Sequence, residues 1–113
     1  MAITNKQLVD NKQTTVAATP ELVYTSPPEG KGTLITNFTV ANSTAIDRTY
    51  QAFIVTSGGS ATTPIVPTRS VLKKETDVPP EVSGQFMPAG AQIFYETSAA
   101  TSISLTVSGR EVS

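Results

Sequence analysis

The chain contains no cysteine, no histidine and no tryptophan among its 113 residues. Without cysteine there is neither a disulfide framework nor a thiolate metal site. Without histidine the chain loses the commonest general base and the commonest metal ligand. The nine carboxylates are scattered along the chain and do not form the close cluster that an oxygen-ligand metal site requires. We therefore predict no catalytic residue, no metal and no cofactor, and we expect that the protein is not an enzyme.

Charge of either sign is sparse too, with eight basic and nine acidic residues. A nucleic-acid-binding surface would need a basic patch, yet the only adjacent basic pair, Lys73-Lys74, is followed at once by Glu75 and Asp77. These two carboxylates are the nearest acidic pair, and beside two lysines they are typical of a solvated strand edge. No apolar run approaches the length of a membrane span, and the first residues lack the apolar core of a secretion signal. We expect no nucleic-acid partner, no membrane partner and no export signal.

Hydroxyl side chains and turn-forming residues dominate what remains. Ser and Thr account for 29 residues, and Gly and Pro account for 15 more. Thr adopts the extended strand conformation readily, whereas Gly and Pro divide a chain into short pieces. Since helix-type periodicity is scarce, this composition predicts an all-β chain. Its length suits one domain with a single two-layer core.

The clearest strand signal lies in the last third of the chain. Ile103, Leu105 and Val107 alternate with hydroxyl residues, which predicts a strand with one buried and one wet face. Residues 92–97 (QIFYET) precede this strand across a short Ser/Ala/Thr connection. Two such runs so close in the sequence predict an antiparallel hairpin.

Shorter strands precede this pair. Residues 22–25 form a short run before a Pro/Gly turn, and residues 33–41 form the next strand, with residues 47–55 as its predicted antiparallel partner. The Gly/Ser-rich segment 57–64 is a loop, and residues 65–72 supply short edge-like pieces. About seven or eight strands at these spacings predict a single antiparallel β-sandwich or jelly roll.

The first 19 residues differ from the rest in being polar and aperiodic. Their candidates for burial are Ile3, Leu8, Val9 and Val16. We predict a partly ordered N-terminal arm over residues 1–19, followed by the sandwich domain over residues 20–113. An alternative is that the arm adds a strand to the sheet edge of a neighbouring subunit.

Large apolar side chains outnumber what one thin core needs, because they fall on both faces of several strands. A surplus of this kind favours contacts with other subunits. The candidate interface residues are Tyr50, Phe53, Phe86, Phe94 and Tyr95 in the strands, together with Ile3, Leu8 and Val9 in the arm. Burial in the protein's own core is the alternative for each of them.

Four pieces of sequence occur in a familiar order. They are residues 22–31 (LVYTSPPEGK), 34–42 (LITNFTVAN), 87–93 (MPAGAQI) and 103–112 (ISLTVSGREV). With these pieces in this order, residues 22–112 resemble the small β-sandwich virion proteins of tailed bacteriophages. The chain departs from their usual pattern in its longer polar N-terminus and at Pro79-Pro80.

This resemblance implies a structural part of a phage particle, made in the host bacterial cytoplasm and located in the virion. It favours a capsid decoration or cement protein that binds and stabilises the assembled head. The implied partners are the major capsid protein or other virion proteins, and further copies of the chain in a dimer or trimer. One alternative is an accessory protein of the neck, collar or tail. Another is a carbohydrate- or receptor-binding module, although such a site usually uses exposed aromatic rings, and the chain has no Trp and only three Tyr.

Overall fold

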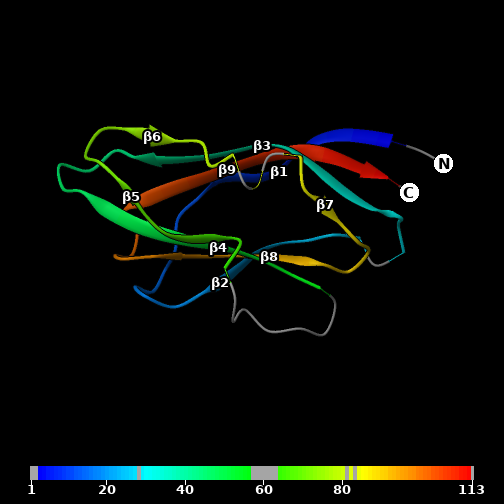
Figure 1. The fold of residues 1–113 in the computed structure, drawn as a ribbon, viewed down its shortest axis with the longest axis horizontal. Coiled ribbons are helices and arrows are strands. Elements are labelled where there is room, and N and C mark those ends of the chain that lie inside the picture. The colour runs from blue at the N-terminus through cyan, green and yellow to red at the C-terminus, as the bar shows by residue number, and fades with distance from the viewer. Residues whose placement is uncertain (1–2, 28, 57–63, 81, 83, 113) are drawn as a thin grey trace.

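The computed structural model describes residues 3–27, 29–56, 64–80, 82 and 84–112 of the chain. The regular elements in these residues are all strands, and they form two antiparallel sheets packed face to face (Figure 1). The prediction of an all-β sandwich is confirmed. The strands of the described residues are β1 (Ile3–Lys12), β2 (Glu21–Thr25), β3 (Gly32–Asn42), β4 (Arg48–Val55), β5 (Val66–Val71), β6 (Thr76–Asp77), β7 (Phe86–Met87), β8 (Gln92–Thr97) and β9 (Ile103–Val112).

The strands pair in a nested order. β1 pairs with β9, β2 with β8, β3 with β6, and β4 with β5, so the chain runs out and back like one long antiparallel hairpin. This hairpin is rolled into one sheet of order β1-β9-β3-β6, with β7 also paired to β3, and a second sheet of order β2-β8-β4-β5. Eight main strands in two sheets with this nested pairing form a jelly roll.

Two predicted pairings between strands close in sequence are wrong. β8 and β9 lie in opposite sheets, and so do β3 and β4. The connection after β8 leads to the other sheet, and within it the backbone N–H of Thr101 donates to the carbonyl of Thr14 at 2.9 Å. A pattern of alternating apolar residues specifies which face of a strand is buried, but it does not specify the neighbouring strand. The loop predicted at residues 57–64 lies mostly outside the described residues.

Residues 3–12 are a strand of the sandwich, and the prediction of an N-terminal arm is wrong for them. β1 pairs with β9 of its own chain along its length, from Ile3 opposite Val112 to Lys12 opposite Leu105. Strand pairing satisfies backbone N–H and C=O groups, so a polar sequence can form a ladder when its partner would otherwise be an open edge. Val9 anchors the strand from the inside, with 4% of its surface exposed.

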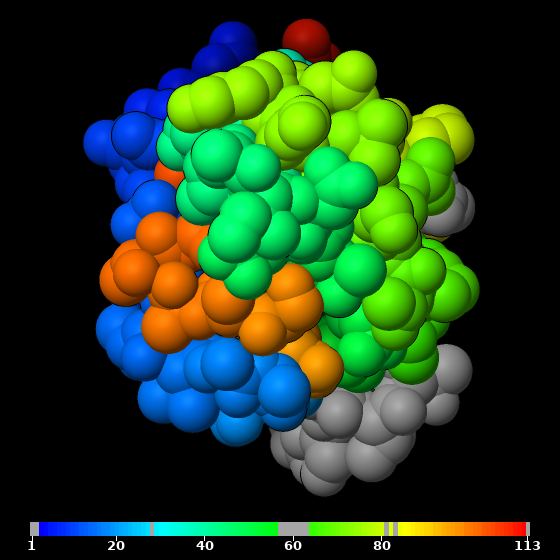
Figure 2. Space-filling view, turned by 90° about the vertical axis from the view of Figure 1, so that its left-hand side faces the viewer, coloured from blue at the N-terminus to red at the C-terminus, as the bar shows by residue number. Residues whose placement is uncertain are grey.

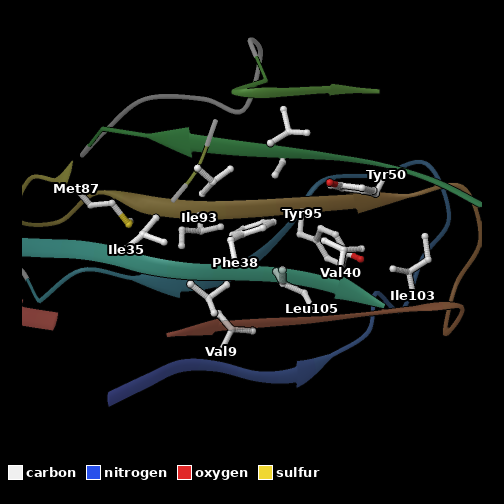
Figure 3. Packing of buried hydrophobic residues seen from close by; sticks show 14 of the residues in the cluster. Val9, Ile35, Phe38, Val40, Tyr50, Met87, Ile93, Tyr95, Ile103 and Leu105 are labelled. Carbon is white, nitrogen blue, oxygen red and sulfur yellow. The ribbon is translucent and has the colours of Figure 1, made fainter. Parts of the chain in front are cut away.

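The core lies between the sheets and is built by the predicted alternation. In β9 the side chains of Ile103, Leu105 and Val107 are fully buried, whereas the residues between them are partly exposed. Phe38 of β3 lies at the centre of this layer, facing side chains of the other sheet such as Ile93 (Figure 3). Burial of each such side chain stabilises the fold by about 1.5–3 kcal/mol.

Candidate functional site

Four of the eight predicted interface residues are buried within the chain. Tyr50 and Tyr95 are 1% and 0% exposed, and their rings pack with centroids 6.1 Å apart. Val9 is 4% exposed and lies in the core, whereas Phe53, also 4% exposed, is covered on the outer face of the four-stranded sheet beside its partner Phe94. The interface prediction is wrong for these four residues, because their side chains are already covered within one chain.

Two of the others, Ile3 and Phe86, are brought together on the five-stranded sheet. Ile3 is 61% exposed and Phe86 is 55% exposed. Ile3 of β1 pairs with Val112 of β9, and Val112 pairs with Gly32 of β3. Gly32 has no side chain, and the Phe86 ring occupies the space beside it, because a Cβ atom added to Gly32 would lie 2.4 Å from the ring. Ile3, Val112 and Phe86 therefore form an apolar row across β1, β9, β3 and β7, which we call the terminal row.

The other two, Leu8 and Phe94, are partly buried and lie apart. Leu8 packs against the core from β1. Phe94 lies on the outer face of the four-stranded sheet, where it pairs with Phe53 of β4 and with Leu22 of β2. Leu22 is 47% exposed and was not among the predicted residues. The sequence indicated only that Leu22 belongs to a short strand. The pairing of that strand with β8 places Leu22 beside Phe94.

A polar cluster closes one open side of the sandwich. The Tyr24 hydroxyl of β2 donates to Glu111 Oε2 of β9 at 2.5 Å, and Lys6 Nζ of β1 lies 3.3 Å from Glu111 Oε1. Burial and the bond to the Glu111 carboxylate raise the pKa of Tyr24 well above its usual range. The cluster joins the edge strands of both sheets, so it fixes their spacing on this side.

A second cluster of the same chemistry closes the opposite side. The Tyr50 hydroxyl of β4 donates to Asp77 Oδ2 of β6 at 2.5 Å, and Arg69 Nε of β5 lies 2.9 Å from the same oxygen. Burial and the Asp77 carboxylate raise the pKa of Tyr50 well above its usual range. Glu75 and Asp77 are the two acidic residues that lie closest together in the sequence. The bond from Tyr50 to Asp77 joins the two sheets, while Glu75 is exposed.

The two buried tyrosines should respond differently to loss of the hydroxyl. The Tyr95 hydroxyl has no hydrogen-bond partner among the described residues, so Tyr95→Phe is expected to leave the free energy of unfolding unchanged or raise it by up to ~1 kcal/mol. Tyr50→Phe is expected to lower it by about 1.5–3 kcal/mol, because it removes a bond to a charged group. Urea denaturation of both variants measures the difference. A larger loss for Tyr95→Phe than for Tyr50→Phe would contradict this account.

A hollow that contains several polar side chains, which we call the polar hollow, lies on the outer face of the four-stranded sheet. It has a volume of about 240 Å³ and is lined by Ala18, Thr49, Tyr50, Gln51, Thr68, Glu96, Thr97 and Ser98. Gln51 pairs with Glu96 across β4 and β8, and Gln51 Nε2 donates to Glu96 Oε2 at 3.3 Å. The rim is formed where residues 15–19 pass the turn after β8, seen in blue and orange in Figure 2, and Ala18 N–H donates to the Thr97 carbonyl at 2.8 Å.

In the described part of the chain, no three His, Cys, Asp or Glu side chains lie where they could together hold a metal ion. The same residues contain no helix long and apolar enough to cross a membrane. Comparisons with protein-family models, with curated proteins and with solved structures find no match to this chain. The candidate sites therefore rest on the geometry of the terminal row and of the polar hollow.

Proposed function

We propose that the chain is a non-enzymatic structural protein of a tailed-phage particle, a decoration protein that binds the assembled capsid and stabilises it. The terminal row is the observation that carries this proposal. It presents two large apolar side chains, Ile3 and Phe86, at more than half exposure on the five-stranded sheet. Exposed apolar groups gathered in one place are typical of a surface that another protein covers.

The fold and the sequence resemblance support the same proposal. Jelly rolls are the domains of many viral capsid proteins, although a fold by itself does not define a function. The two closing clusters, Tyr24–Glu111–Lys6 and Tyr50–Asp77–Arg69, tie the sheets together on both sides. A sandwich tied in this way offers a rigid surface, which lowers the entropy lost when copies dock on a lattice. The proposed partners are the major capsid protein and further copies of this chain, as a dimer or trimer.

Counting copies in purified particles tests the location. Quantitative mass spectrometry against the major capsid protein is expected to give on the order of hundreds of copies, as an icosahedral lattice requires. A count of roughly a dozen or fewer would place the protein in the neck or tail, where cyclic symmetry applies. Absence from the particle would overturn the proposal.

The surface is tested with the double variant Ile3→Ser/Phe86→Ser. We expect its affinity for particles lacking the protein to fall at least tenfold, because each side chain loses about 1.5–3 kcal/mol of apolar burial at the interface. The wild-type protein should raise the melting temperature of such particles, and the variant should not. The matched control is Val16→Ser/Leu72→Ser, which alters two other side chains of similar exposure, 53% and 49%. Equal loss in both double variants would exclude the terminal row as the specific surface.

A further inference from the structure

The polar hollow contains hydrogen-bonding groups that the fold itself leaves unused. The carboxylate of Glu96 accepts one bond, from Gln51, through Oε2. This leaves Glu96 Oε1 and the Gln51 amide oxygen without a bond among the described residues. Ser98 Oγ accepts from the Thr49 N–H at 3.1 Å, so its own proton remains available. Thr68 lines the hollow too, and its hydroxyl makes no hydrogen bond among the described residues.

These groups combine strong acceptors with hydroxyls that both donate and accept. A ligand that complements them must offer several donors and several acceptors at close spacing. A phosphate or sulfate offers acceptors only and would meet the negative charge of Glu96. The ion pairs of the described residues join Lys6 to Glu111 and Arg69 to Asp77. Glu96 belongs to neither of these two pairs.

Size and surroundings narrow the ligand further. About 240 Å³ is below the ~300–1,000 Å³ of sites for drug-sized ligands, so the hollow suits a single ring. The lining also includes Ala18 and three threonines, whose methyl groups supply apolar carbon beside the polar groups. Polar groups beside apolar carbon match the two kinds of surface of a sugar, whose hydroxyls bind and whose C–H groups pack.

We propose that this hollow binds one neutral sugar ring of a glycan, with Glu96 and Gln51 accepting from adjacent sugar hydroxyls. Thr49, Thr68 and Ser98 contact the remaining hydroxyls of the ring. A site with so few polar groups and one ring of contact is a weak one, with a Kd on the order of 1 mM. The inference goes beyond the proposed function and does not depend on it, because an isolated chain suffices to test it.

The test is NMR titration of the isolated ¹⁵N-labelled protein with glucose, galactose, mannose and N-acetylglucosamine, each at millimolar concentration. At least one sugar is expected to shift the amide signals of Gln51, Glu96 and Ser98 in a saturable way. Glu96→Gln keeps the shape of the side chain and removes its charge, and it should weaken binding about tenfold. The matched control is Glu29→Gln, an exposed acid before β3, which should bind as the wild type does.

Three results would overturn the proposal. The first is that none of the four sugars shifts these signals. The second is that Glu96→Gln and Glu29→Gln bind equally well. The third is that butylammonium shifts the same signals while the sugars do not, which would make the hollow a site for a cationic side chain. Each result leaves the particle proposal to its own copy-number test.

Discussion

Raising the pH above about 10 is expected to unfold the protein in a cooperative transition. All three tyrosines of the chain, Tyr24, Tyr50 and Tyr95, have a pKa raised above the ordinary value of 10 in the folded state. Burial is the first cause in each case, and the carboxylates of Glu111 and Asp77 add to it for Tyr24 and Tyr50. The folded state therefore holds protons that the unfolded state releases.

The sign of the effect follows from proton linkage. Below pH 10 both states keep the tyrosine protons, and the stability is fully present. Above pH 10 the unfolded state loses them first, so the free energy of unfolding falls as the pH rises toward the folded-state pKa values. For Tyr50 and Tyr95, which are almost completely buried, the loss is up to about 1.4 kcal/mol per pH unit for each residue.

The measurement is a parallel titration of tyrosinate absorbance and of the circular dichroism of the sheets. Both signals are expected to change together, because Tyr50 and Tyr95 keep their hydroxyl protons while they are buried. The variant Tyr95→Phe removes one of the linked protons, so its transition should be less steep and should lie at higher pH. Tyrosinate that forms near pH 10 while the sheet signal stays intact would contradict the burial of these hydroxyls.

Deleting residues 1–12 is expected to destroy most of the stability of the fold. The deletion removes β1, and with it the buried Val9 and the partly buried Leu8. It also exposes β9 as an open edge of the sheet, and an unprotected edge of this length promotes aggregation. The loss of apolar burial and of the β1–β9 ladder should exceed about 3 kcal/mol, a large part of the ~5–15 kcal/mol typical of a domain.

Denaturant unfolding and size-exclusion chromatography measure the outcome. The truncated chain is expected to lose its cooperative transition or to aggregate, whereas Ile3→Ser, which changes an exposed side chain of the same strand, should unfold like the wild type. A truncated chain that is monomeric and equally stable would show that β1 contributes little. Loss of particle binding on deleting residues 1–19 would report on folding as well as on any contact with a neighbour.

The sequence predicted the strands better than their partners. Residues 103–107 alternate so regularly that their buried face could be assigned, and β2, β3, β4 and β5 lie within a few residues of their predicted ranges. Alternation is a local property, because successive side chains point to opposite faces of any strand. Pairing is a long-range property, and the hydroxyl-rich linker at 98–101 suits a corner between sheets as well as a hairpin.

The candidate sites were harder to predict for the same reason. Tyr50 and Tyr95 have large rings that fit an interface or a core equally well, and only the folded structure shows that both are buried in the core. The terminal row requires Ile3 and Phe86, which are 83 residues apart in sequence, to meet across β9 and β3. The polar hollow likewise joins Gln51 to Glu96. No spacing pattern in the sequence indicates that these residues are neighbours in the fold.

The nested pairing of the strands also sets the order in which the protein can be made. β9 is the last strand of the chain, yet it lies between β1 and β3 in the five-stranded sheet. While the ribosome is still adding residues 103–112, β1 has no strand to pair with and β3 has only the short strands β6 and β7, so the five-stranded sheet cannot close. Folding must then wait until this segment has left the exit tunnel, and non-local pairing of this kind is slow.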